Sequence, residues 1–175
     1  MNAYIEKANT ILDVCAESGS NTILYSKLNE NANIYSFEPK HSLFLQLSKN
    51  IQQNDIKNVT IFNNAIGNLS KQIHIDSDSD DTLFGLVGED VDMITVDSLG
   101  LTNCDFININ SAEESAKLAL IGAIKTIRKY KPTICFKSMK PSICHDIIRK
   151  LGDYEFTKID DHRYLAAHVE NEDTI

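Results

Sequence analysis

Residues 11–19, together with the acid at position 38, constrain the fold of this chain more than any other feature. Residues 11–19 read Ile-Leu-Asp-Val-Cys-Ala-Glu-Ser-Gly, an apolar strand followed by a turn of small residues. Glu38 follows Asp13 by 25 residues and ends a second apolar strand. This spacing is typical of a nucleotide-binding βαβ unit, in which the turn admits a ligand close to the backbone and the acid accepts two ribose hydroxyls. The Gly-x-Gly-x-x-Gly order of nicotinamide-dependent enzymes is absent, which disfavours a reductase.

Apolar strands and amphipathic helices alternate along the rest of the chain. This alternation predicts an α/β fold with a mainly parallel seven-stranded sheet, helices on both faces and a C-terminal antiparallel hairpin. The predicted strands are residues 11–15, 34–37, 59–62, 105–110, 133–136, 154–159 and 164–169, with exposed strands at 72–76 and 91–96. The predicted helices are a lead-in helix at 2–9, one from a Ser20-Asn21 cap to 28, one with Pro39 in its first turn, and others at 113–130 and 142–151.

Length and composition predict a single domain of residues 1–175, ending in a frayed tail at 170–175. The net charge of −8 disfavours nonspecific binding to nucleic acid or to an anionic membrane. No apolar run reaches the roughly 18 residues of a membrane span, and the first ten residues carry two charges and no apolar stretch, so we expect neither a spanning helix nor a secretory signal. The four cysteines form no CxxC pair, which indicates reduced thiols and a cytoplasmic location.

Several ordered segments resemble the FkbM-type methyltransferase family, over about residues 10–169. That family carries Asp-Val-Gly-Ala-Asn-x-Gly, Phe-Glu-Pro, Asn-x-Ala-Ile-Gly and Thr-x-Asp-Ser-Leu in this order. The matching segments here are Asp13 to Gly19, Phe37-Glu38-Pro39, Asn63-Asn64-Ala65-Ile66-Gly67 and Thr95-Val96-Asp97-Ser98-Leu99. The resemblance implies a Rossmann-like class I methyltransferase that uses S-adenosylmethionine, often to methylate a sugar hydroxyl.

The resemblance also assigns cofactor contacts. Glu38, followed by Pro39, would hold the ribose, and the turn of Cys15, Ala16 and Gly19 would face the methionine end of the cofactor. The adenine would lie beside Asn63, Asn64 and Ala65. Asp13 has two interpretations, a cofactor contact or a brace for neighbouring backbone N–H groups.

The sequence departs from the family where catalysis is expected. Asn108 and Asn110 stand where the family has a lysine and an acid, and Ala112 and Lys137 replace two glutamates. Asparagine cannot remove a proton, but it can orient a hydroxyl, so Asn108 and Asn110 are the candidate catalytic residues. Cys15 replaces a family glycine and Glu17 adds charge near the cofactor carboxylate, which predicts weak cofactor binding.

Two functions therefore remain open. The first is an S-adenosylmethionine-dependent O-methyltransferase acting on a sugar, a glycan or another small-molecule hydroxyl. The second is a catalytically inactive, methyltransferase-like binding or scaffold protein. In either case a second subunit or a protein partner is a candidate to cover the acceptor site. Residues 76–81 are acidic but lack the glycine of a calcium loop, so they are interpreted as solvated and no metal is expected.

Overall fold

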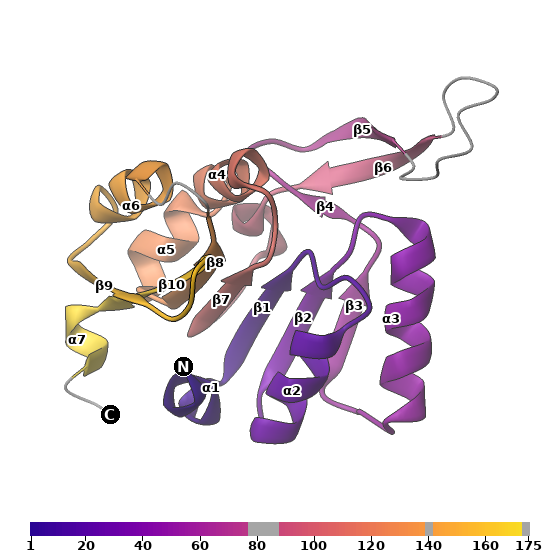
Figure 1. Ribbon diagram of the computed structural model, residues 1–175, viewed down its shortest axis with the longest axis horizontal. Helices are drawn as coiled ribbons and strands as arrows, with labels where there is room; N and C mark the ends of the chain where they lie inside the picture. Colours follow the sequence, from indigo (N-terminus) through magenta and orange to yellow (C-terminus); the bar gives the residue numbers. More distant parts are fainter. Residues whose placement is uncertain (77–87, 139–141, 173–175) are drawn as a thin grey trace.

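The computed structural model describes residues 1–76, 88–138 and 142–172. Its main strands are β1 (Thr10–Val14), β2 (Asn33–Phe37), β3 (Val59–Phe62), β7 (Phe106–Ile109), β8 (Thr133–Lys137), β9 (Tyr154–Lys158) and β10 (Arg163–His168). They form one sheet in the order β3-β2-β1-β7-β8-β10-β9 (Figure 1). The first five strands in this order are parallel, and β10 is antiparallel to both of its neighbours. The predicted sheet and its C-terminal hairpin are confirmed.

Helices cover both faces of this sheet, as expected for a parallel sheet (Figure 1). The first face carries α1 (Asn2–Lys7), α2 (Ser20–Leu28) and α3 (His41–Gln53), and the second carries α4 (Glu113–Ile121), α5 (Ile124–Tyr130) and α6 (Ser142–Arg149). Successive strand residues alternate between the two cores: Ile11 packs with Tyr25 of α2, whereas Leu12 belongs to the cluster of Leu120 and Ile127. None of the described helices is long and apolar enough to cross a membrane.

A second, three-stranded sheet lies beside the carboxyl ends of the main strands (Figure 1). It consists of β4 (Ala65–Ile66), β5 (Lys71–Asp76) and β6 (Gly88–Ile94), in the order β4-β6-β5. The sequence predicts β5 and β6, but it does not predict β4 or its pairing with β6. The strand expected at 91–96 ends at Ile94, and η2 (Val96–Leu99) follows as a 3-10 helix. Most of the acidic segment 76–81 lies outside the described residues.

The prediction of one helix over residues 113–130 is wrong, because the chain breaks at Gly122 between α4 and α5. A Cβ on Gly122 would collide with the backbone oxygen of Gly67, so this break packs directly against the loop after β4. Asp97 then supplies the start of α5. Its carboxylate accepts the N–H groups of Lys125 at 3.0 Å and Thr126 at 2.8 Å, which otherwise have no helical partner.

Three further boundaries differ from the sequence prediction. Pro39 precedes α3, because the Glu38 carboxylate accepts the Lys40 N–H at 2.9 Å and holds this turn outside the helix. Ser20 lies inside α2, because Gly19, with a left-handed φ of 93°, is the N-cap. Residues 169–172 form the short helix α7 (Val169–Glu172) in place of a frayed tail, and residues 173–175 lie outside the described part.

Candidate functional site

The turn after β1 lies at the carboxyl-terminal edge of the sheet, where open α/β sheets bind their ligands. Cys15, Glu17 and Gly19 have φ values of 58°, 52° and 93°. A left-handed residue other than glycine costs roughly 1–2 kcal/mol. Glycine, which the FkbM family has at the position of Cys15, adopts this conformation without that cost. Cys15 adopts the same conformation under strain. Glu17 turns its side chain to solvent, which removes part of the charge conflict expected from the sequence.

Glu38 is brought directly against this turn. One carboxylate oxygen accepts the Glu17 N–H at 2.8 Å, and the other accepts the Lys40 N–H at 2.9 Å. Only 3% of the residue is exposed, and this burial raises the pKa of Glu38, while the two N–H bonds oppose the rise. Each oxygen keeps a second lone pair. The structure thus places Glu38 at the turn in a fixed orientation, and each of its carboxylate oxygens can still accept one more hydrogen bond.

Asn63 lies next to Glu38, at the end of β3. Its amide nitrogen donates to the Glu38 and Pro39 carbonyls at 2.9 and 3.0 Å, and its oxygen lies 3.0 Å from Nδ1 of His41. Asn64 donates to the Asp92 carbonyl at 3.0 Å, and Ala65 pairs with Met93 inside β4. These side chains brace the end of β2 and the second sheet, and an adenine contact at Asn63, Asn64 or Ala65 stays a prediction.

Asp13 lies beneath the turn and is fully buried. Its carboxylate accepts the Thr22 hydroxyl at 2.5 Å and the Asn108 amide at 2.8 Å, and Thr22 also contacts the Ser36 hydroxyl at 3.0 Å. Burial raises the pKa of Asp13 from 3.8 to about 6, with the Thr22 and Asn108 bonds opposing the rise. The network ties β1 to β7, α2 and β2. Asn108 therefore orients Asp13, and a catalytic role for Asn108 stays a prediction.

The residues after β7 come to the same edge. Asn110 is half-buried, and its N–H donates to the Val14 carbonyl at 3.0 Å, level with the turn. Ser111 is 9% exposed, and its hydroxyl lies beside the Cys15 thiol, whose pKa it acts to lower, with no other hydrogen-bond partner in the part of the chain that the structure describes. One carboxylate oxygen of Glu113 is likewise enclosed without a partner there. Ser111 is not among the site residues expected from the sequence, although a hydroxyl directly after the fourth parallel strand was a usable signal.

Burial raises the pKa of Cys15 to about 12, and the nearby Glu38, Asp13 and Glu17 reinforce the rise. The thiol is therefore neutral at physiological pH and is not a nucleophile. Among the described residues, no group of three or more His, Cys, Asp or Glu side chains could hold a metal ion. A pocket of about 360 Å³ exists on the second face, lined by residues that include Tyr35, Phe62 and Leu101, away from the turn.

Several methyltransferases of known structure share this fold. The methyltransferase FkbM from Methylobacillus flagellatus superposes with a TM-score of 0.71 and 16% identity, over 91% of this chain and 43% of that one. An rRNA methylase from Streptococcus thermophilus has a TM-score of 0.55 and 10% identity, covering 94% and 90% of the two chains. TYW2 from M. jannaschii, in complex with AdoMet, has a TM-score of 0.53 and 18% identity, covering 94% and 70%.

These similarities establish a Rossmann-like methyltransferase fold. The chain spans less than half the length of the FkbM structure that it matches. No family model matches the chain, and no curated protein matches it.

Proposed function

We propose that this chain is an S-adenosylmethionine-dependent methyltransferase that methylates a hydroxyl of a sugar or glycan. The observation that carries the proposal is the pairing of Glu38 with the turn after β1. The Glu17 N–H holds the carboxylate at 2.8 Å, so one rigid unit presents both the acid and the turn. Methyltransferases that share the fold support this function, and one of them was solved with the cofactor.

The residues at this edge fit the cofactor. Glu38 would accept the vicinal ribose hydroxyls through its remaining lone pairs. The left-handed turn of Cys15, Ala16 and Gly19 would lie against the methionine end, and the Asn63 segment beside the adenine. Asp13 would hold the strand end beneath them through Thr22 and Asn108. The bound cofactor would supply an activated methyl group, so that alignment of the acceptor provides much of the acceleration.

The acceptor hydroxyl would lie above β7, beside Asn110 and Ser111. The Ser111 hydroxyl, which lies beside the Cys15 thiol, could donate to the acceptor oxygen or accept from it. Asn110 would orient the acceptor by hydrogen bonding but could not take its proton. A positioned base typically contributes on the order of 10²–10⁴-fold. We therefore expect a slow enzyme, unless the half-buried Glu113 supplies that base.

The proposal is tested by methyl transfer from radiolabelled S-adenosylmethionine to a panel of mono- and disaccharides. Wild-type protein should label at least one sugar, and Glu38→Ala should abolish the labelling. Glu6→Ala, an exposed acid on α1, is the matched control and should retain full activity. Circular dichroism of each variant verifies that it folds. Equal labelling by wild type and Glu38→Ala would show that the cofactor binds elsewhere.

A second candidate is an inactive relative that binds a ligand or a protein partner. The observation favouring it is that Asn108 is committed to Asp13 and that no acid stands at positions 108, 110, 112 or 137. This candidate predicts cofactor binding without turnover on any sugar, or no cofactor binding. Under either proposal, we also expect a cytoplasmic location. We expect a second subunit or a protein partner to cover the acceptor edge of the sheet.

A further inference from the structure

Two cationic residues lie directly opposite each other at the carboxyl-terminal edge of the sheet. Lys137 is the last residue of β8, and its register partner in the antiparallel pair is Arg163, the first residue of β10. Directly opposed residues project from the same face of a sheet, and like charges in such a pair are destabilising. The FkbM family that this sequence resembles commonly has a glutamate at the position of Lys137. A positive charge therefore stands here in place of a negative one.

The pair continues a row of residues that begins at the cofactor turn. Ile109 pairs with Phe136, and the Asn110 N–H donates to the Val14 carbonyl, so Asn110 and Lys137 stand level with the turn. Neighbouring strands lie about 4.8 Å apart. The backbone of Lys137 therefore lies about 5 Å from that of Asn110, and the backbone of Arg163 lies about 10 Å from it, measured along this edge. An acceptor whose hydroxyl lay at Asn110 would extend along this edge toward the two cations.

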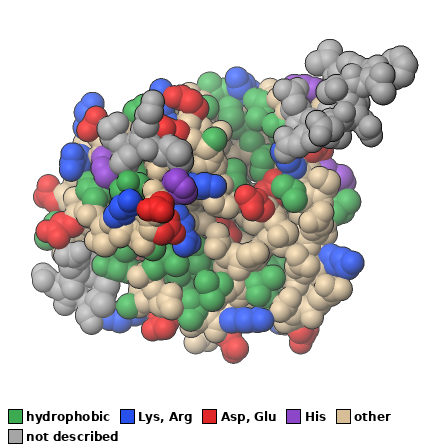
Figure 2. All heavy atoms as spheres, viewed as in Figure 1, with side chains coloured by type: hydrophobic (Ala, Val, Ile, Leu, Met, Phe, Trp, Pro, Cys, Tyr) green, Lys and Arg blue, Asp and Glu red, His purple; other side chains and the backbone are tan. Residues whose placement is uncertain are grey.

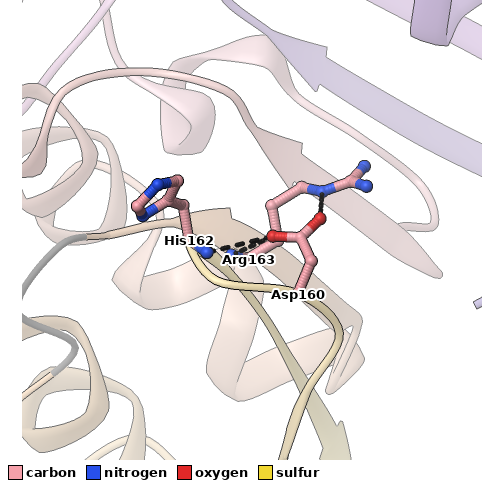
Figure 3. A network of polar contacts seen from close by, with 3 residues as sticks. All are labelled: Asp160, His162 and Arg163. Atoms are coloured by element: carbon pink, nitrogen blue, oxygen red, sulfur yellow. Dashed lines mark hydrogen bonds and ion pairs between the residues drawn. The ribbon is translucent and has the colours of Figure 1, made fainter.

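Arg163 is held in place by Asp160 (Figure 3). One Asp160 oxygen accepts the Arg163 Nε–H at 2.6 Å, and the other accepts the N–H groups of His162 and Arg163 at 3.0 and 2.9 Å. The His162 N–H and then the Arg163 side chain keep the pKa of Asp160 below its usual value, so the carboxylate stays ionised.

The outer part of the guanidinium is left open. Its two terminal nitrogens make no hydrogen bond or ion pair with any residue that the structure describes, and they point away from Asp160 in Figure 3. Lys137 is exposed and has no ion-pair partner among the described residues either. The Asp160 contact alone would explain a closed hairpin turn. It does not explain why the terminal nitrogens of an oriented guanidinium stay open at a position that is in register with a second exposed cation.

We propose that Lys137 and Arg163 form a subsite for an anionic group, a carboxylate or a phosphate, carried by the methyl acceptor. A guanidinium binds both groups in a bidentate manner, and an ammonium beside it adds a point charge. The net charge of −8 disfavours a nucleic acid as the source of the phosphate. The identity of the ligand as acceptor rests on the proposed methyltransferase function, whereas the anion site itself does not.

The anion site is tested without cofactor. ¹⁵N-labelled protein is titrated with inorganic phosphate and, separately, with acetate at constant ionic strength, and the Arg163 side-chain Nε–H and the Lys137 backbone amide are followed by NMR. Saturable shifts are expected. Arg163→Gln and Lys137→Gln should each weaken binding by about tenfold or more, the scale for a lost hydrogen bond to a charged group. Lys49→Gln, an exposed lysine on α3, is the control and should bind as wild type does. Unsaturable shifts, or equal affinity in all variants, would overturn the proposal.

The acceptor role is tested with three matched sugars in the presence of S-adenosylhomocysteine. Glucuronate carries a carboxylate, glucose 6-phosphate carries a phosphate, and glucose carries neither. At least one anionic sugar should bind about tenfold or more tightly than glucose, and Lys137→Gln and Arg163→Gln should remove this preference. If S-adenosylhomocysteine binds but the three sugars bind equally, the subsite is refuted and the methyltransferase proposal stands. If S-adenosylhomocysteine does not bind but phosphate saturates the site, the anion site stands and the methyltransferase proposal fails.

Discussion

Replacing Asp13 by asparagine should make the free energy of unfolding less sensitive to rising pH. Burial raises the pKa of Asp13 from 3.8 to about 6, so between these values the folded chain binds more protons than the unfolded chain. The free energy of unfolding therefore falls as pH rises through this window. A shift of about two units corresponds to roughly 3 kcal/mol, at about 1.4 kcal/mol per unit.

Asparagine at position 13 keeps the hydrogen bonds without the charge. Its oxygen can accept the Asn108 amide, and its own amide can donate to the Thr22 hydroxyl, which turns toward Ser36. Relative to wild type, Asp13→Asn should therefore gain up to roughly 3 kcal/mol of stability between pH 4 and pH 7.

The assay is urea denaturation of wild type and Asp13→Asn at pH 4, 5, 6 and 7. The chain has no tryptophan, so unfolding is followed by far-ultraviolet circular dichroism. The quantity of interest is the difference between the two unfolding free energies at each pH, because other titrating groups cancel in it. Asp153→Asn, an exposed acid, is the control. A difference that does not change with pH, or that moves in favour of wild type as pH rises, would show that folding does not raise the pKa of Asp13.

Three further substitutions follow from the packing. Gly122→Ala should lose about 1–3 kcal/mol of stability in denaturation, because its Cβ would meet the rigid Gly67 backbone, and an unchanged midpoint would contradict that contact. His145→Phe should raise the melting temperature, because it removes a buried ring nitrogen that has no partner among the described residues; a lower value would show that this nitrogen is satisfied. Cys15→Gly should tighten S-adenosylhomocysteine binding, because glycine adopts the left-handed turn without a Cβ, and weaker binding by calorimetry would argue against this role.

The main sheet was predictable because its signal is local. Each parallel strand is a short apolar run followed by a helical pattern, and the hairpin after β8 has its own polar turn. The second sheet was not predictable, because β4 is only two residues long and owes its pairing to β6, which lies over twenty residues further along the chain. The break at Gly122 was missed for a related reason, since the contact that requires it comes from Gly67.

The candidate site shows the same division. Glu38 and the turn were recognisable because spacing along the chain places them together. Asp13 was recognised as an acid with two roles, but its partners Thr22 and Asn108 come from other elements and only the fold identifies them. The apposition of Lys137 and Arg163 depends on the β8–β10 register, which neither local sequence specifies.

The most direct test of the proposed cofactor site is a calorimetric titration of wild type and Glu38→Ala with S-adenosylhomocysteine. We expect saturable binding to wild type, weaker than low micromolar because Cys15 strains the turn. We also expect Glu38→Ala to lose this binding while remaining folded. Absence of heat at millimolar ligand, or equal affinity of the two proteins, would contradict the placement of the cofactor at Glu38.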